Sequence, residues 1–254
     1  MATYRMHGRG PIHAVAIHGW FNDHAAFDAM LTGIDPDRFS LLLLDLRGYG
    51  SRRDSDGPFD IETMAADALT AADAVGWDRF SVIGHSMGGK AALKLALTAA
   101  ERVEKIVGIT PVWAGAAPFD PPTRAYFQQA AASLEIREAI LDLTTGSRLP
   151  LSWLKRAAER SAAISDQGAF AAYFESWSGD DFANDASAIE QPVLVFAGGR
   201  DKGIPEELIR TTWLSSLSRA GLVVLPEAGH YPMDECPLIL AAEVVAFLDP
   251  QQTR

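Results

Sequence analysis

The chain has a single cysteine, Cys236, among its 254 residues. One thiol excludes an intrachain disulfide and is typical of a protein from a reducing compartment. No apolar run approaches the roughly 20 residues that a membrane-spanning helix needs, and residues 1–10 lack the apolar core of a secretory signal. We therefore expect a cytoplasmic protein that does not insert into a membrane.

Positive charge is also scarce, because 22 Lys and Arg residues stand against 33 Asp and Glu residues and give a formal net charge of −11. Nucleic acids and anionic membranes are bound by clustered Lys and Arg, so this balance argues against both partners. The sequence lacks a dinucleotide-binding fingerprint and any Cys, His or carboxylate cluster with metal-site spacing. We expect no metal and no cofactor, and a small-molecule substrate as the partner.

Strands and helices alternate along most of the chain, of which 48% is apolar. The predicted strands are 3–7, 12–17, 40–44, 80–83, 104–110, 192–197 and 222–225, and the predicted helices between them are 60–75, 91–100, 206–217 and 238–248. Because these strands are apolar on both faces, they indicate an α/β fold with a parallel sheet covered on both sides.

The alternation stops between residues 112 and 188. This stretch contains no convincing strand pattern, and four helices are predicted in it, at 122–132, 134–144, 151–163 and 167–177. A helical insertion into a continuous core explains the change. We therefore predict a core of residues 1–111 and 189–254 and a helical cap of residues 112–188.

Residues 84–89, Gly-His-Ser-Met-Gly-Gly, join a predicted strand to a predicted helix. Such an abrupt turn forces its central residue, Ser86, toward positive φ, and Gly84 and Gly88 remove the Cβ atoms that would collide. Ser86 then stands at a helix N-terminus, where backbone N–H groups can stabilise the charge that develops on an attacked carbonyl. The motif predicts a nucleophilic serine.

The same residues also fit a phosphate-binding loop, since Gly84, Gly89 and Lys90 match the pattern G-x-x-x-x-G-K. That pattern requires Ser or Thr next, because the hydroxyl holds Mg²⁺, and the next residue here is Ala91. The nucleotide interpretation is therefore disfavoured. Lys90 is expected to be a solvated residue in the first turn of the helix.

A serine hydroxyl needs a base, and the base needs an orienting acid. Asp201 directly follows the predicted strand 192–197, and His230 follows the next predicted strand, 222–225. Both side chains are therefore expected at the carboxyl edge of the sheet, beside Ser86. The order Ser, Asp, His along the chain is typical of a nucleophile-elbow hydrolase.

Each of these assignments has an alternative. Asp201 also suits a helix N-cap or an arginine partner. Asp180 and Asp181 are other carboxylates, more typical of caps and solvated charges. Among the remaining histidines, His85 lies inside the turn and is a weaker base candidate, and His18 is expected to brace a loop.

Five motifs together resemble the α/β-hydrolase family. They are His-Gly-Trp at 18–20, Asp-Leu-Arg-Gly-Tyr-Gly at 45–50, the turn at 84–89, Gly-Gly-Arg-Asp at 198–201 and Gly-His at 229–230. The resemblance covers nearly the whole chain and implies a mostly parallel, doubly wound sheet with a helical cap. Since family members often have a longer N-terminal hairpin, the first strand is expected to be missing here.

By this resemblance Ser86 is the nucleophile, His230 the general base and Asp201 the residue that holds the imidazole. The oxyanion donors are then the backbone N–H groups of Trp20 and Met87. A subset of the cap's aromatic residues is expected to line an apolar pocket above Ser86. These candidates are Trp113, Tyr126, Phe127, Trp153, Tyr173 and Trp177, together with Trp20 and Met87.

We therefore predict a serine hydrolase that cleaves a small or medium, largely apolar carboxylic ester through a covalent acyl-enzyme. The same triad in related enzymes opens lactones, hydrolyses thioesters, cleaves a carbon–carbon bond of a vinylogous diketone or performs cofactor-free perhydrolysis. A small-ligand receptor with a degenerate hydrolase pocket is the non-enzymatic alternative.

Overall fold

The computed structural model describes residues 4–249, and within them seven strands form one sheet in the order β1-β3-β2-β4-β5-β6-β7. The strands are β1 (Tyr4–Gly8), β2 (Ile12–Ile17), β3 (Phe39–Leu44), β4 (Phe80–His85), β5 (Val103–Ile109), β6 (Val193–Gly198) and β7 (Ala220–Leu225). β1 runs antiparallel to β3, and the other neighbouring pairs are parallel. The predicted α/β fold with a mostly parallel sheet is confirmed.

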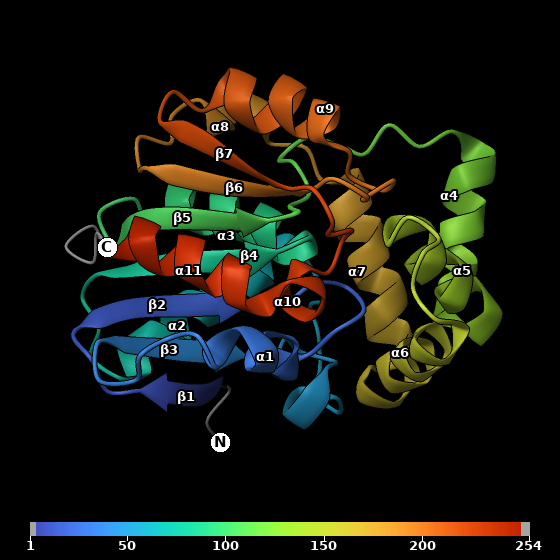
Figure 1. Cartoon of the computed structure of the whole chain (residues 1–254), viewed down its shortest axis with the longest axis horizontal. Helices are drawn as coiled ribbons and strands as arrows, with labels where there is room; N and C mark the ends of the chain where they lie inside the picture. The colour runs from blue at the N-terminus through green and yellow to red at the C-terminus, as the bar shows by residue number, and fades with distance from the viewer. Residues whose placement is uncertain (1–3, 250–254) are drawn as a thin grey trace.

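Helices cover both faces of this sheet (Figure 1). Its front is covered by α1 (Asp28–Leu31), α10 (Pro232–Glu235) and α11 (Pro237–Leu248), and its back by α2 (Ile61–Ala74) and α3 (Met87–Thr98). All residues of β3 and β4 are buried as a result. This arrangement explains why the central strands are nearly continuous apolar runs.

One strand, β1, precedes β2 in the described residues. The strand predicted at 3–7 is observed one residue later, and its first predicted residue, Thr3, lies outside the described residues. The helix predicted at 206–217 is also irregular. It consists of α9 (Glu206–Ile209) followed by a π-helical turn over Arg210–Leu214.

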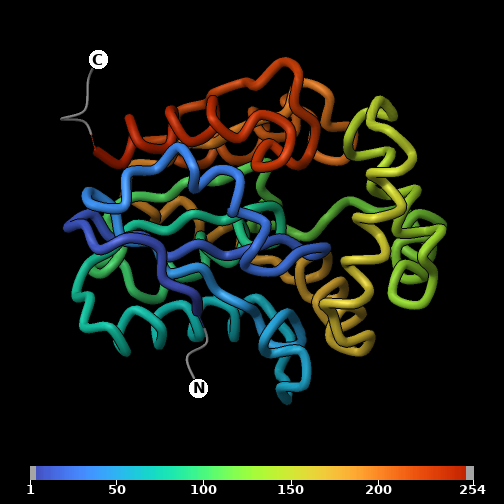
Figure 2. Tube along the Cα trace, turned by 60° about the horizontal axis from the view of Figure 1, so that its bottom comes forward, coloured from blue at the N-terminus to red at the C-terminus, as the bar shows by residue number. Residues whose placement is uncertain are grey.

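Between β5 and β6 the chain forms a helical segment, residues 112–188, without a strand. It contains α4 (Pro121–Gln128), a 3₁₀ turn (Gln129–Ala131), α5 (Leu134–Thr144), α6 (Leu151–Ile164), α7 (Gln167–Gly179) and α8 (Ala183–Ala186). Helices α4 to α7 gather at one end of the sheet, at the right of Figure 1, and lie beside the core in Figure 2 as well. The helical segment thus lies at one end of the strands.

Among the residues described, no helix has the length and apolar character that a bilayer crossing requires.

Candidate active site

The turn after β4 places Ser86 at the N-terminus of α3 with φ 51° and ψ −116°. This positive φ confirms the strained backbone predicted from the sequence. The turn is possible because a Cβ on Gly84 would lie 2.2 Å from the carbonyl oxygen of Gly88, and one on Gly88 would lie 2.2 Å from that of Ile17. Any side chain at either glycine would push the turn apart.

The structure brings together the three side chains predicted from distant parts of the sequence. His230 Nε2 lies 2.9 Å from Ser86 Oγ, and His230 Nδ1 lies 2.6 Å from Asp201 Oδ2. All three residues are buried. In the neutral imidazole, Nδ1–H donates to the carboxylate and Nε2 accepts from the serine hydroxyl, which is the geometry of a nucleophile paired with its base.

The second oxygen of Asp201 is also used. Asp201 Oδ1 accepts the backbone N–H groups of Gly203 and Ile204, at 2.8 and 3.0 Å. Because both oxygens have partners, the carboxylate is held in position toward His230. The alternative carboxylates are placed elsewhere. Asp180 accepts from the Ser176 hydroxyl, and Asp181 accepts the N–H of Ala183.

The backbone on both sides of His230 is held by one carboxylate. Glu235, at the end of α10, accepts the N–H of Gly229 at 2.8 Å and the N–H of Tyr231 at 3.0 Å. It also pairs with Arg148 of the helical segment, and its side chain is 3% exposed. No sequence motif points to Glu235. Its partners are backbone N–H groups, and Glu235 reaches them only because the chain folds into the short helix α10 after His230.

The carbonyl of His230 accepts two further hydrogen bonds. His85 Nε2–H and Thr110 Oγ1–H each donate to it, at 2.9 Å. Burial, followed by the neighbouring His230, moves the pKa of His85 well below its usual value, so the ring is neutral. His85 therefore supports the base instead of replacing it, as expected. Thr110 was not a candidate in the sequence, because nothing local marks it.

Two backbone N–H groups are available for an oxyanion. Met87 is the first residue of α3, so its N–H has no acceptor within the helix. In the part of the chain that the structure describes, neither this N–H nor that of Trp20 donates to a protein acceptor. The Trp20 loop is held in place, since its carbonyl accepts from Tyr49 Oη and its indole N–H donates to the Phe170 carbonyl, both at 2.8 Å.

His18 braces this loop, as predicted. Its Nδ1–H donates to the carbonyl of Gly19 at 2.9 Å, and its Nε2 accepts the N–H of Leu46 at 3.2 Å. Burial lowers the pKa of His18 despite this hydrogen bond. A neutral ring is what this donor and acceptor pattern requires.

A cavity of about 570 Å³ opens above Ser86 and His230. Of the predicted pocket residues, Trp20, Trp113, Phe127 and Trp177 line it. The other lining side chains are mainly apolar and include Val112, Phe119, Ile140, Leu143, Ile204 and Leu208. The cavity is suited to an apolar group whose end reaches the serine hydroxyl.

Three predicted pocket aromatics do not line this cavity, and neither does Met87, which is fully buried. Tyr126 is 39% exposed, because it lies about 100° around α4 from Phe127. Tyr173 is 1% exposed and packs against Tyr49. The predictions for Tyr126 and Tyr173 were wrong, because the rotation of each helix decides which of its rings faces the cavity.

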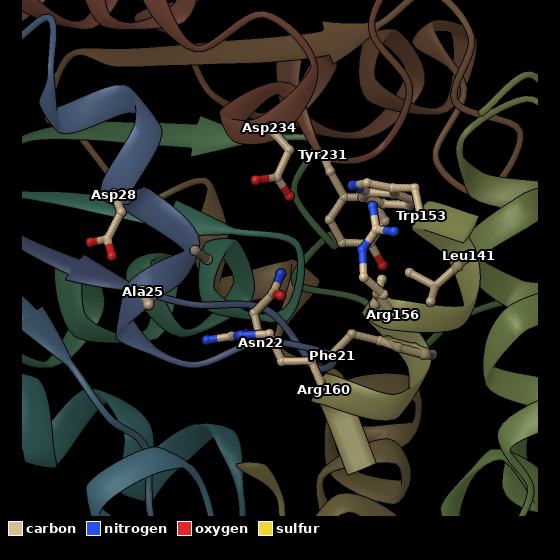
Figure 3. A pocket seen from close by; sticks show the side chains of 12 residues that line it. Phe21, Asn22, Ala25, Asp28, Leu141, Trp153, Arg156, Arg160, Tyr231 and Asp234 are labelled. Carbon is tan, nitrogen blue, oxygen red and sulfur yellow. The ribbon is translucent and has the colours of Figure 1, made fainter. Parts of the chain in front are cut away.

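The third, Trp153, lines a second cavity of about 370 Å³ between the loop after β2, α10 and α6. Figure 3 shows its polar groups, with Arg156 near Trp153 and Asp234 above. Burial raises the pKa of Asp234, an effect that Arg160 opposes. Phe21 and Tyr231 border both cavities and stand between them.

The prediction for Lys90 was also wrong. The side chain is completely buried, and its ammonium donates to backbone carbonyls of the helical segment. Sequence position suggested solvent, because the first turn of a helix after a sheet edge is commonly exposed. The covering chain lies more than 20 residues away in sequence, so the local pattern carries no sign of it.

Folding also brings Asp23, His24 and Asp45 together, with possible ligand atoms within 4.8 Å of one another. These atoms have protein partners. Asp45 accepts from the backbone and ring of His24 and from Ser51, and Asp23 pairs with Arg160. Burial opposes ionisation of Asp45, but these hydrogen bonds outweigh it and lower its pKa to about 2. The cluster therefore holds the loop after β2.

Residues 15–237 match the model of a family described as alpha/beta hydrolase fold. The chain belongs to the α/β-hydrolase fold family. The match covers most of the chain, including the turn at Ser86 and the loop at His230. The protein is accordingly a hydrolase.

Relatives that align with most of the chain agree with this assignment. A pimeloyl-(acyl-carrier protein) methyl ester esterase from Nitrosomonas europaea is 28% identical over 245 residues, which cover 91% of this chain and 92% of the relative. A putative carbamate hydrolase from a Caulobacter species is 28% identical over 222 residues, 83% of this chain and 81% of the relative. A bromoperoxidase from Bacillus anthracis is similar in structure, with a TM-score of 0.86 and 18% identity over 96% of this chain and 94% of the other, which shows the shared fold.

Proposed function

We propose that the protein hydrolyses small or medium, largely apolar carboxylic esters through a Ser–His–Asp triad and a covalent acyl-enzyme. The observation that carries the proposal is the relay from Asp201 through His230 to Ser86, which ends at the floor of an apolar cavity. Esterase activity named for relatives that span most of the chain supports the same reaction class.

In the first step Ser86 Oγ attacks the ester carbonyl, and its proton passes to His230 Nε2, 2.9 Å away. The imidazolium that forms is stabilised by the carboxylate of Asp201, which already accepts Nδ1–H. Because the relay is buried, this charge pairing is stronger than it would be in water.

The carbonyl oxygen becomes an oxyanion in the tetrahedral intermediate. The N–H groups of Trp20 and Met87 are assigned to it, since Met87 follows Ser86, Trp20 lines the same cavity as Ser86, and neither N–H donates to an acceptor in the described residues. One such donor is typically worth about 3–4 kcal/mol of transition-state stabilisation. These donors are backbone groups, so only the position of the loop and the helix places them.

His230 then protonates the leaving alcohol, and the acyl group remains on Ser86. A water molecule, activated by the same Nε2, attacks the acyl-enzyme and releases the acid. Atoms balance over the two steps, since the ester and one water give one alcohol and one acid. No other reactant is needed.

The helical segment is proposed as a cap, residues 112–188, over a core of residues 1–111 and 189–254. It contributes Trp113, Phe119, Phe127 and Trp177 to the cavity wall. An apolar wall favours binding of apolar groups by burial of their surface. We therefore assign substrate selection to the cap, and the catalytic residues belong to the core.

A panel of p-nitrophenyl esters, lactones, thioesters and vinylogous diketones tests the proposal. Wild-type protein should turn over the esters with the highest kcat/KM, and Ser86→Ala should lose turnover while its circular dichroism stays unchanged. Ser215→Ala is the matched control, because Ser215 is exposed and its hydroxyl donates to the carbonyls of Thr211 and Thr212 in the π-helical turn after α9. Ester turnover in Ser86→Ala equal to that of the wild-type protein would contradict the proposal. A higher kcat/KM for lactones, thioesters or diketones than for esters would contradict it as well. Binding of these compounds without product would indicate a receptor.

A further inference from the structure

One buried cation has no part in the proposed chemistry. The Lys90 side chain lies in the first turn of α3, and its Nζ donates to the carbonyls of Gly115 and Trp177, each at 3.0 Å, and to that of Asp180. An ammonium has three N–H donors, so every donor is used. Burying a charge without such partners would be strongly unfavourable, which makes this contact set specific.

The three carbonyls belong to the two stretches through which the chain enters and leaves the helical segment. We name these stretches, residues 114–117 and 177–182, the crossing segments. They bind each other, since Ala117 N–H donates to the Ser178 carbonyl at 2.8 Å and Phe182 N–H donates to the Ala114 carbonyl at 3.0 Å. Lys90 joins this pair to the core.

Two of the acceptors lie at the C-terminal end of α7, which ends at Gly179. Carbonyls in the last helical turn have no donor within the helix, and a cation there is favoured by the helix dipole. Burial lowers the pKa of Lys90 to about 8, and the carboxylates of Asp180 and Asp181 oppose this effect while Lys94 adds to it. Lys90 therefore acts as the cap of α7, although it lies on another element.

The crossing segments also form part of the wall of the main cavity. Gly115, Ala116, Ala117 and Trp177 line it. Ser86 immediately precedes α3, four residues before Lys90, so the nucleophile and the ammonium share one helical turn. The contact thus connects the wall to the reacting hydroxyl through a single rigid element.

We propose that Lys90 is a positioning residue for substrate selection, which holds the crossing segments at a fixed distance from Ser86 and so sets the width of the cavity. The kinetic part of this inference rests on the proposed function. Its structural part does not, because it concerns only the arrangement of the crossing segments.

The test compares Lys90→Met with Lys105→Met. Methionine keeps the length of the side chain and removes its donors. Lys105 is matched in chemistry, since its Nζ donates to the carbonyls of Phe247 and Leu248 at the end of α11, yet it does not line the cavity. Hydrogen exchange, kinetics with esters of increasing acyl length, and labelling of Ser86 by a small fluorophosphonate are measured for each.

For Lys90→Met we expect amide exchange in the crossing segments to rise about tenfold or more, because their local opening becomes easier. KM should rise about fivefold for the best ester, with a smaller change in kcat, since the loss concerns binding. The preferred acyl length should shift. Labelling of Ser86 should stay within about twofold, because the triad is untouched, and Lys105→Met should show none of these changes.

Unchanged exchange in the crossing segments of folded Lys90→Met, or the same changes in Lys105→Met, would overturn the inference. If Lys90→Met does not fold, amide hydrogen exchange in the wild-type protein tests the inference instead. The inference then requires that the amides of Ala117 and Phe182 are as protected as those of β5. Exchange of these amides at the rate of exposed loops would overturn it. A wild-type protein that turns over no ester would contradict the proposed function and leave the exchange result valid.

Discussion

The carboxylate of Glu235 accepts the backbone N–H groups that flank His230, from Gly229 and from Tyr231. It thereby fixes the position of the imidazole without touching the ring. The contact also ties the base to the helical segment, because Glu235 pairs with Arg148.

Glu235→Gln should lower kcat/KM roughly tenfold, because an amide offers one acceptor oxygen and leaves one of the two buried N–H groups without a partner. Steady-state hydrolysis of the best ester measures the effect. Glu227→Gln is the control, since Glu227 is exposed and pairs only with Arg200. Equal kcat/KM for Glu235→Gln and wild type would show that the loop needs no such support.

Thr110→Val should lower kcat by about threefold to tenfold, since it removes one of the two donors to the His230 carbonyl while valine keeps the shape of the side chain. The remaining donor, His85, limits the loss. Thr110→Ser retains the hydroxyl and should stay near the wild-type kcat. A loss shared by both variants would indicate a packing effect.

Trp113→Ala should enlarge the main cavity and shift the preferred ester toward longer acyl chains, because Trp113 lines that cavity. Trp153→Ala is the matched control, since Trp153 lines the second cavity instead. Relative kcat/KM values across a series of p-nitrophenyl esters measure the shift. A larger shift for Trp153→Ala would mean that substrates reach the second cavity.

Asp45→Asn should lower the free energy of unfolding at neutral pH, and this destabilisation should become smaller as the pH falls. The folded-state pKa of about 2 lies below the reference value of 3.8, so ionised Asp45 stabilises the fold above pH 4, and this contribution is lost as pH falls toward 2. The difference in unfolding free energy between wild type and variant should shrink by about 1 kcal/mol from pH 6 to pH 3. Urea titrations at both pH values measure it, with exposed Asp56→Asn correcting for loss of one negative charge.

Much of the core was predictable because its signals are local. β2 and α5 have the predicted boundaries, since apolar periodicity alone defines them. The meeting of Asp201 and His230 with Ser86 was predictable for a topological reason, because the carboxyl ends of parallel strands share one edge of the sheet.

The remaining features depend on contacts that no local pattern encodes. The neighbours Tyr126 and Phe127 lie on the same helix, and only its rotation against the core decides that Phe127 lines the cavity. Lys90 is buried by chain 25 to 90 residues away in sequence. The burial of Lys90 depends on how the helical segment packs against the core, and composition and residue spacing do not predict that packing.

The positive φ of Ser86 has a consequence for the evolution of the chain. Glycine adopts this backbone conformation without strain, whereas serine loses about 1 kcal/mol or more of stability there. A sequence selected for thermal resistance alone would therefore replace the serine. Ser86→Gly should melt at a higher temperature than the natural protein and have no hydroxyl left to acylate. At this turn the protein therefore has lower thermal stability in exchange for a nucleophile.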